Sequence, residues 1–212
     1  MPAVPTWPDR LIAALDQGLK AVAAPTASTR PSPAADIAET PLSADERHQS
    51  AALMRVNHAG EIAAQALYNG QSLVARSAAT RELLDNAARE ERDHLAWCAT
   101  RLDELGSRPS LLTPLWYAGS YCIGVLAGVA DDARSLGFVS ETERQVEVHL
   151  RDHLQRLPPH DHRSAAILMR MAQDEAHHGT TAALAGGTEL PAVIRRGMTL
   201  GGEILRRVAL IV

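Results

Sequence analysis

The spacing of apolar residues along the chain predicts a protein built from helices. Beyond residue 43, apolar positions recur about every three to four residues, and Gly or Pro separates the periodic stretches. Ser43-Ala44-Asp45-Glu46 has the pattern of a capping box, and Gly106 suits a left-handed helix end. The predicted helices cover residues 43–76, 80–105, 114–157, 164–184 and 191–208, with the third bent or broken near Gly137.

The first forty residues have a different character. Residues 8–24 predict a short amphipathic helix, whose apolar side consists of Leu11, Ile12, Leu15, Leu19 and Val22. A stretch rich in Ser, Thr and Ala follows and contains Pro25, Pro31, Pro33 and Pro41, which predicts an irregular linker. We therefore expect two parts. Residues 1–42 form an N-terminal amphipathic helix and linker, and residues 43–212 form one helical bundle.

Composition narrows the class of protein. A chain of 212 residues is long enough to bury one good core, and its few aromatic residues favour helix over sheet. The net charge of −4 gives no reason to expect a nucleic-acid partner. Two cysteines suggest neither a disulfide scaffold nor a cysteine zinc site. Asp9, Arg10 and Asp16 interrupt any secretory signal, so we expect a reducing, intracellular compartment.

A repeated Glu-x-x-His motif is the most informative feature of the bundle region. Each copy follows a lone Glu, at intervals of 30 and 32 residues. A helix, a short turn and the start of a second helix account for such an interval. The two sets therefore predict two helical hairpins that offer equivalent side chains to one shared site. The six residues are Glu61, Glu91, His94, Glu143, Glu175 and His178.

These residue types in this pattern indicate a metal centre. Residues three apart on a helix point from nearly the same face, so each Glu-x-x-His pair can grip one metal or two adjacent metals. A carboxylate among apolar residues, such as Glu61, is costly to bury unless a cation compensates its charge. Four carboxylates and two imidazoles facing a core form a ferritin-like dinuclear ligand set. The predicted fold is all-α, a ferritin-like four-helix bundle with a short N-terminal helix and an additional C-terminal helix.

Several positions have alternatives that spacing leaves open. Glu143 ends a second capping-box pattern, residues 140–143, and Glu147, one turn later, also fits the repeat. His177 pairs with Asp174 as a second choice, because aspartate has a shorter reach.

Other charged residues near the motif are set aside on the helical pattern. Glu91 is favoured over Glu90, since the apolar side near Glu91 is marked by Leu84, Ala87 and Leu95. His149 and His153 lie off the Glu143 face of their helix, so we expect them at the surface or behind the ligands.

Residues 43–212 resemble the demethoxyubiquinone hydroxylases of ubiquinone biosynthesis. The likeness rests on Asn57-His58-Ala59-Gly60-Glu61 leading to Tyr68, on Glu91-Arg92-Asp93-His94-Leu95, on Asp174-Glu175-Ala176-His177-His178, and on Glu143 six residues before His149. The resemblance favours Glu143 over Glu147. The first forty residues lie outside the shared region.

The resemblance implies two iron ions and a set of ligand roles. Glu61 with His94 holds one iron, Glu143 with His178 holds the other, and Glu91 and Glu175 bridge them. Each histidine needs an acceptor for its other ring nitrogen, which the sequence does not assign. Tyr68 lines the site or helps to pass an electron, or is an ordinary core tyrosine.

The implied activity is that of a di-iron monooxygenase. It hydroxylates a polyprenyl methoxy-methyl-benzoquinol with dioxygen as co-substrate. The reductant is NADH or the quinol itself, and no Gly-x-Gly-x-x-Gly motif indicates a bound dinucleotide. The alternative is a ferritin-like ferroxidase or iron-storage protein, for which we expect acidic outer faces.

Two apolar segments point to a membrane. The stretch 110–130 carries no charge and is long enough to span a bilayer, but its helix must continue to Glu143 inside the bundle. We therefore expect a largely buried helix with an apolar rim of Leu111, Leu112, Leu115, Trp116 and Tyr117. The last helix combines an apolar face with Arg195, Arg196, Arg206 and Arg207. It suits either core packing with solvated arginines or peripheral attachment to an anionic membrane.

The expected location is accordingly the cytoplasmic side of a bacterial cell membrane. The expected partners are the polyprenyl quinone, membrane lipid and other quinone-biosynthesis proteins.

Overall fold

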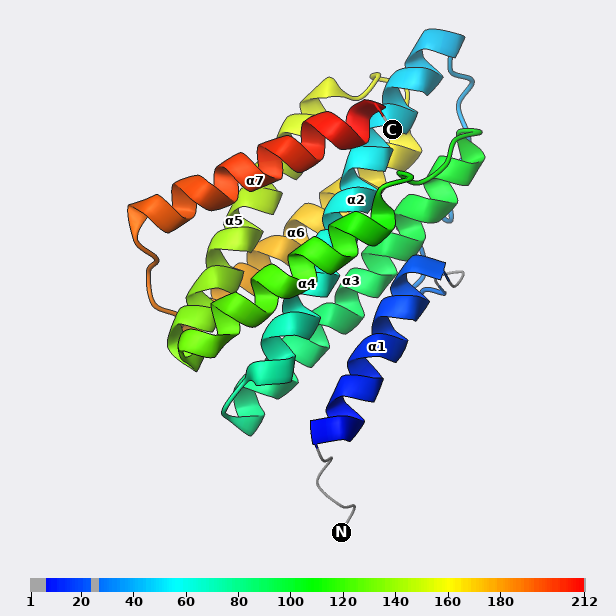
Figure 1. The fold of residues 1–212 in the computed structure, drawn as a ribbon. Helices are drawn as coiled ribbons and strands as arrows, with labels where there is room; N and C mark the ends of the chain where they lie inside the picture. Colours follow the sequence, from blue (N-terminus) through cyan, green and yellow to red (C-terminus); the bar gives the residue numbers. More distant parts are fainter. Residues whose placement is uncertain (1–6, 24–26, 212) are drawn as a thin grey trace.

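The fold consists of helices, as the sequence predicts. A computed structural model describes residues 7–23 and 27–211, and within these ranges it contains seven helices and no strand (Figure 1). The helices are α1 (Trp7–Ala23), α2 (Ala44–Val74), α3 (Ala78–Glu104), α4 (Thr113–Ala130), α5 (Asp132–Arg156), α6 (His162–Leu184) and α7 (Ala192–Ile211). The all-α prediction is confirmed, and most boundaries lie within three residues of the expected ones.

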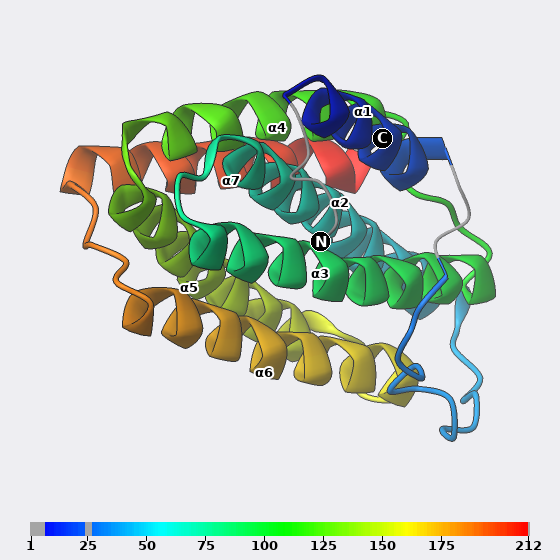
Figure 2. The same cartoon turned by 90° about the horizontal axis from the view of Figure 1, so that it is seen from below.

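Four helices form the bundle that carries the candidate site. Helix α2 packs along α3, and α5 packs along α6, which are the two predicted hairpins; contacts of α3 with α6 and of α2 with α5 close the ring. Helices α1, α4 and α7 cover the α2 side of this bundle, and α6 lies on the opposite side (Figure 2). Fully buried apolar side chains fill the core, among them Leu53, Met54, Leu102, Leu150, Leu168 and Met171.

The helix ends follow local chemistry. Ser43 caps α2 by accepting a hydrogen bond from the Glu46 backbone N–H, while the Glu46 side chain bonds back to Ser43, so the predicted capping box is present. Gly106 follows α3 with a φ of +68°, the left-handed conformation expected there.

The expected bend or break near Gly137, in the helix predicted over residues 114–157, is wrong in its position. The chain breaks at Asp131, whose extended backbone (φ −172°, ψ 166°) separates α4 from α5 and whose side chain accepts from the Arg134 N–H. Gly137 lies inside α5. A Cβ there would collide with the backbone carbonyl of Thr188, so this glycine permits close packing rather than a bend.

Helix α4 is far less buried than expected. It lies outside the four-helix ring and packs on α2 through one face, where a Cβ at Gly124 would collide with the Leu67 carbonyl and one at Gly70 with the Tyr121 carbonyl. The opposite face is exposed and apolar, with Leu126 exposed to 73%. Across the described ranges, we find no helix that combines the length and the apolarity needed to cross a bilayer.

Candidate metal centre

The structure brings the six motif residues together in the middle of the bundle. Helix α2 supplies Glu61, α3 supplies Glu91 and His94, α5 supplies Glu143, and α6 supplies Glu175 and His178. All six are buried, and none is more than 7% exposed. Four separate helices therefore converge on one water-excluded point.

The ligand atoms form two overlapping groups. In one group the atoms of Glu61, Glu91, His94 and Glu175 all lie within 4.8 Å of one another; the other joins Glu91, Glu143, Glu175 and His178 in the same way. Glu91 and Glu175 belong to both groups. The arrangement thus describes two adjacent positions that share two carboxylates.

Both histidines present the same nitrogen to the cluster. The Nδ1 atom of His94 lies 3.1 Å from Glu175 Oε1 and 3.2 Å from Glu91 Oε2. The Nδ1 atom of His178 lies 3.4 Å from Glu175 Oε2 and 3.5 Å from Glu91 Oε1. These distances leave one imidazole nitrogen and several carboxylate oxygens facing a common space on each side.

The other ring nitrogen of each histidine has an acidic partner that sequence reasoning missed. His94 Nε2 lies 3.0 Å from Asp174 Oδ2, and His178 Nε2 lies 3.0 Å from Glu90 Oε2. Such an acceptor fixes the tautomer and the ring orientation of a metal-binding histidine. A sequence signal was available, because an acidic residue precedes the Glu of both motifs and each one supports the histidine of the other hairpin.

Burial and mutual repulsion perturb the acids of the cluster. Burial, together with the negative charge of Glu91, raises the pKa of Glu61 well above its usual value. Burial likewise raises the pKa of Glu143, with further contributions from Glu175 and Glu91. Burial also opposes the ionisation of Glu91, but the nearby imidazoles of His178 and His94 outweigh it and lower the pKa of that carboxyl.

The two imidazoles respond in the opposite direction. Burial lowers the pKa of His178, but the nearby carboxylates of Glu175 and Glu91 outweigh this effect and raise the pKa to about 12. Burial lowers the pKa of His94 too, and the surrounding carboxylates, Asp174 first, raise it well above normal. Protons therefore occupy the place that cations take in a loaded site.

Unpartnered buried atoms show that this cluster fits metal ions. Within the described residues, both oxygens of Glu175, one oxygen each of Glu91 and Glu143, and Nδ1 of His178 are buried without a hydrogen-bond partner. Leaving so many polar atoms unsatisfied is costly. Hard carboxylate oxygens with two imidazoles suit a divalent first-row metal such as iron.

Tyr68 lies directly beside this cluster. Its hydroxyl, on α2, donates a hydrogen bond to Glu143 Oε1, and the whole side chain is buried. Burial and the negative charge of Glu143 raise the pKa of Tyr68 well above its usual value, so it stays protonated and remains a donor. Tyr68 therefore contacts a site carboxylate, unlike an ordinary core tyrosine.

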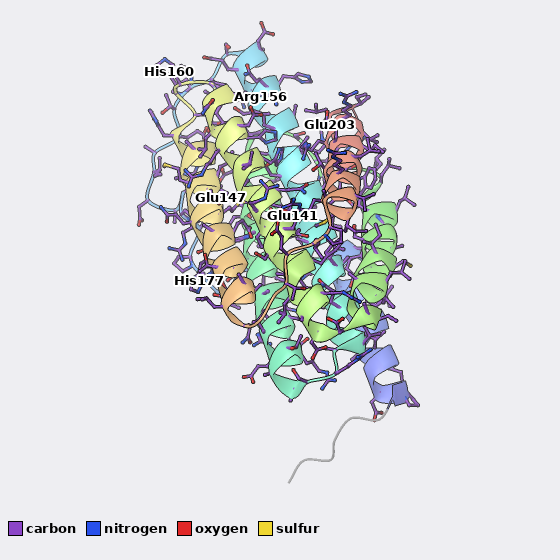
Figure 3. All side chains as sticks on the ribbon, turned by 90° about the vertical axis from the view of Figure 1, so that its left-hand side faces the viewer. Glu141, Glu147, Arg156, His160, His177 and Glu203 are labelled. Atoms are coloured by element: carbon purple, nitrogen blue, oxygen red, sulfur yellow. The ribbon has the colours of Figure 1, made fainter. Side chains whose placement is uncertain are left out.

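The structure places the alternatives that spacing left open at different depths in the bundle. Glu143 is 1% exposed and lies in the cluster, whereas Glu147 bonds to Arg151 on the outer side of α5. His177 is exposed on the outer face of α6, and both Glu147 and His177 lie on the surface turned toward the viewer in Figure 3. The stretch 140–143 lies inside α5, so it caps no helix.

Two further histidines were expected at the surface or behind the ligands. His153 is not at the surface: it is 2% exposed and its Nδ1 lies 2.8 Å from Asn57 Oδ1. Burial lowers its pKa to about 3. His149 packs edge-on against His153 and lines a cavity next to the cluster.

That cavity connects the cluster to the outer surface. It has a volume of about 610 Å³ and lies between α2, α4, α5 and α7, with Glu61 in its wall. Most of its lining is apolar, including Leu67, Ile123, Phe138 and Leu205. Leu115, Ile123, Val193 and Ile194 both line it and are exposed on the outside. An apolar molecule can therefore reach Glu61 from the surface formed by α4 and α7.

Comparison with known proteins decides the family. The family model described as "Ubiquinone biosynthesis protein COQ7" matches residues 48–209. The chain belongs to this family. Similar proteins include the 3-demethoxyubiquinol 3-hydroxylases of Nitrosomonas europaea, at 52% identity over 95% of this chain and 97% of that protein, and of Ralstonia pickettii, at 54% over 95% and 98%. That of Legionella pneumophila is 53% identical over 93% of each chain.

These comparisons also correct and extend the sequence analysis. Alignment over 95% of the chain extends into the first forty residues, which were expected to lie outside the resemblance. A solved structure, the dodecameric thioferritin described as the bacterioferritin-related protein of Bacteroides fragilis, superposes with a TM-score of 0.54 at 18% identity. The match covers 63% of this chain and 82% of that chain, and it supports the ferritin-like fold alone.

Proposed function

We propose that this enzyme hydroxylates a polyprenyl demethoxyubiquinol at a di-iron centre during ubiquinone biosynthesis. Family membership and the hydroxylase relatives support the reaction class. The observation that carries the proposal is the apolar cavity that ends at Glu61, one of six buried ligands. A redox site joined to an apolar cavity suits a lipophilic ring better than a soluble ion.

The proposed ligands follow from the two overlapping groups. Glu61 and His94 would hold one iron, Glu143 and His178 the other, and Glu91 and Glu175 both. The two irons, when bound, supply the chemistry that activates dioxygen. The chain excludes water around them, since all six side chains are buried, and it fixes each imidazole through Asp174 or Glu90.

Tyr68 is the residue that we assign a direct role beside the metals. Its hydroxyl holds one oxygen of Glu143, which limits how that carboxylate can reorient during turnover. Because its pKa is raised, Tyr68 keeps its proton. It can pass this proton toward the site only when another group supplies a new proton in return. Two electrons are also needed, and the quinol or an external reductant such as NADH would supply them.

The cavity mouth supports peripheral attachment to a membrane. Large apolar residues are exposed on α4 and α7 around it: Leu115, Ile123, Leu126, Val129, Val193, Ile194, Leu200 and Ile204. Arginines on α7, among them Arg196 and Arg207, would face anionic headgroups on the cytoplasmic side of the cell membrane. A polyprenyl tail would then stay in lipid, which avoids about 0.8 kcal/mol for each CH₂ moved into water.

Iron storage is the competing function, and one experiment separates the two. Protein reconstituted anaerobically with ferrous iron should bind about two irons per chain and, under isotopically labelled dioxygen, place one labelled oxygen atom on a short-chain demethoxyquinol. Glu143→Gln should abolish the product, and Glu147→Gln, one turn away on the outer side of α5, should retain it. Iron uptake well beyond two per chain without product would favour storage.

A further inference from the structure

The segment that precedes α2 reaches back to the candidate metal centre. We call residues 27–43 the strap. At its start, Asp93 of α3 accepts hydrogen bonds from the Thr29 backbone N–H at 2.6 Å and from Arg30 Nε at 2.8 Å. The Ser28 hydroxyl bonds to the same carboxylate at 3.0 Å. At the other end of the strap, Glu39 pairs with the buried Arg101. The strap is therefore attached to the bundle at both ends.

Arg30 bridges two helices of the bundle. Its Nε binds Asp93 of α3, and its Nη1 lies 2.9 Å from Asp174 Oδ2 of α6. The same Asp174 oxygen lies 3.0 Å from His94 Nε2. One guanidinium, one carboxylate oxygen and one imidazole thus form a continuous line from the strap to a proposed iron ligand.

The indole ring of Trp97 packs against both Arg30 and His94. The Arg30 guanidinium lies over the Trp97 ring, 4.8 Å from its centre, and the Trp97 N–H donates to Ser28 Oγ at 3.1 Å. Trp97 in turn packs against His94, with ring centres 5.3 Å apart. Arg30 is thereby held on two carboxylates and one aromatic face, which limits its freedom to move.

The second histidine lacks equivalent support. His178 has Glu90 as its partner, and the Glu90 side chain is 45% exposed. The Asp174 side chain is only 9% exposed. The two halves of the site share ligands and spacing, but they differ in how firmly the acceptor behind each imidazole is held.

We propose that Arg30 is a positioning residue that orients His94 through Asp174 and makes the Glu61/His94 position the more rigid of the two metal positions. The inference rests on the proposed di-iron function. Arg30 acts on the oxygen that faces the imidazole. Arg170 also pairs with Asp174, but through the other oxygen, at 2.9 Å and from a half-exposed side chain. Each arginine places one positive charge beside Asp174, but only Arg30 contacts the oxygen that faces His94.

The experiment compares Arg30→Ala with Arg170→Ala in the full chain. Anaerobic titration with ferrous iron measures the two affinities, and Mössbauer spectra of the loaded proteins report each iron. Arg30→Ala should weaken one metal position about 10-fold or more and alter one of two ferrous signals, since lost support behind a metal-binding histidine costs about 10–100-fold in affinity. Arg170→Ala should change either affinity by less than about threefold, as expected for an exposed ion pair.

Three results would overturn the proposal: wild-type affinities and spectrum in Arg30→Ala, equal weakening of both positions, or the same change in Arg170→Ala. If Arg30→Ala fails to fold, Arg30→Lys replaces it, because lysine keeps the charge but cannot bridge Asp93 and Asp174 with a planar fork. Arg30→Lys should weaken the same single position. Failure of the wild-type chain to bind two irons would instead refute the proposed function.

Discussion

At the scale of single residues, the site is an accumulation of buried charge that only cations or protons can balance. Four carboxylates and two imidazoles share one buried space, and several of their atoms have no hydrogen-bond partner within the described chain. Burial of that kind is costly unless the charges are paired or coordinate metal ions. The residues around the cluster, Tyr68 among them, then decide how each ligand is held.

Tyr68→Phe tests the residue that contacts Glu143. Removing the hydroxyl leaves a buried carboxylate oxygen without its donor, an effect of about 1.5–3 kcal/mol for a charged group. We expect hydroxylation to slow about 10-fold while metal analysis still finds two irons per chain. Tyr117→Phe is the matched control, because that buried hydroxyl bonds to Asn69 and to no proposed ligand. Equal turnover of Tyr68→Phe and wild type would contradict the role.

His58→Leu tests the acid sensitivity of the fold. Burial lowers the pKa of His58 from 6.5 to about 4, so between these values the unfolded chain binds a proton that the folded chain does not. Stability is therefore lost as pH falls through this window. Between pH 7 and 5 the loss from His58 is about 2 kcal/mol. Urea unfolding at pH 7 and pH 5 measures the free energy of unfolding of both proteins. His58→Leu should lose about 2 kcal/mol less than wild type between these pH values. An identical loss in both proteins would refute the prediction.

The sequence predicted the six motif residues because chance seldom repeats such a pattern at equal spacing. It did not assign the acceptors behind the histidines, because the acidic residue before each motif has an equally good reading as a surface residue. Glu90 sits in a charged string that also describes a solvated helix face, and only the packing of α3 against α6 brings it to His178. Arg30 was equally hidden, because its partners lie 63 and 144 residues away in the chain.

At the scale of elements, helix ends were predictable and helix packing was not. Ser43 and Gly106 act through their immediate neighbours, so local patterns located them. The break at Asp131 was missed because glycine disfavours helix more than aspartate does, so Gly137 was chosen as the helix breaker. In the structure Gly137 instead allows α5 to pack closely against the backbone of Thr188. The exposure of α4 was also missed, since an uncharged helix reads the same whether buried in protein or placed against lipid.

Gly124→Ala tests the close crossing of α4 over α2. The added methyl group would meet the Leu67 backbone carbonyl, which cannot move aside without shifting α2. Forced packing of this kind costs about 1–3 kcal/mol, or roughly 2–10 °C in melting temperature for a chain of this size. Gly119→Ala, on the same helix but facing open space, should melt no lower than wild type. Thermal unfolding followed by circular dichroism decides, and equal melting of the two variants would contradict the crossing.

At the scale of the whole molecule, the proposed docking to a membrane rests on the apolar surface around the cavity mouth. Leu126→Glu, on α4, should weaken binding to phosphatidylglycerol-containing vesicles about 10-fold, because it removes an apolar contact and adds repulsion from anionic lipid. Met169→Glu places the same charge on α6, on the opposite side of the bundle, and should bind within about twofold of wild type. Equal binding of both variants in a flotation assay would place the docking surface elsewhere.

Anomalous X-ray scattering from crystals of the iron-loaded protein tests the central claim most directly. We expect two iron peaks in the bundle core, one beside Glu61 and His94 and one beside Glu143 and His178, with Glu91 and Glu175 between them. A single peak, or peaks bound by other side chains, would contradict it.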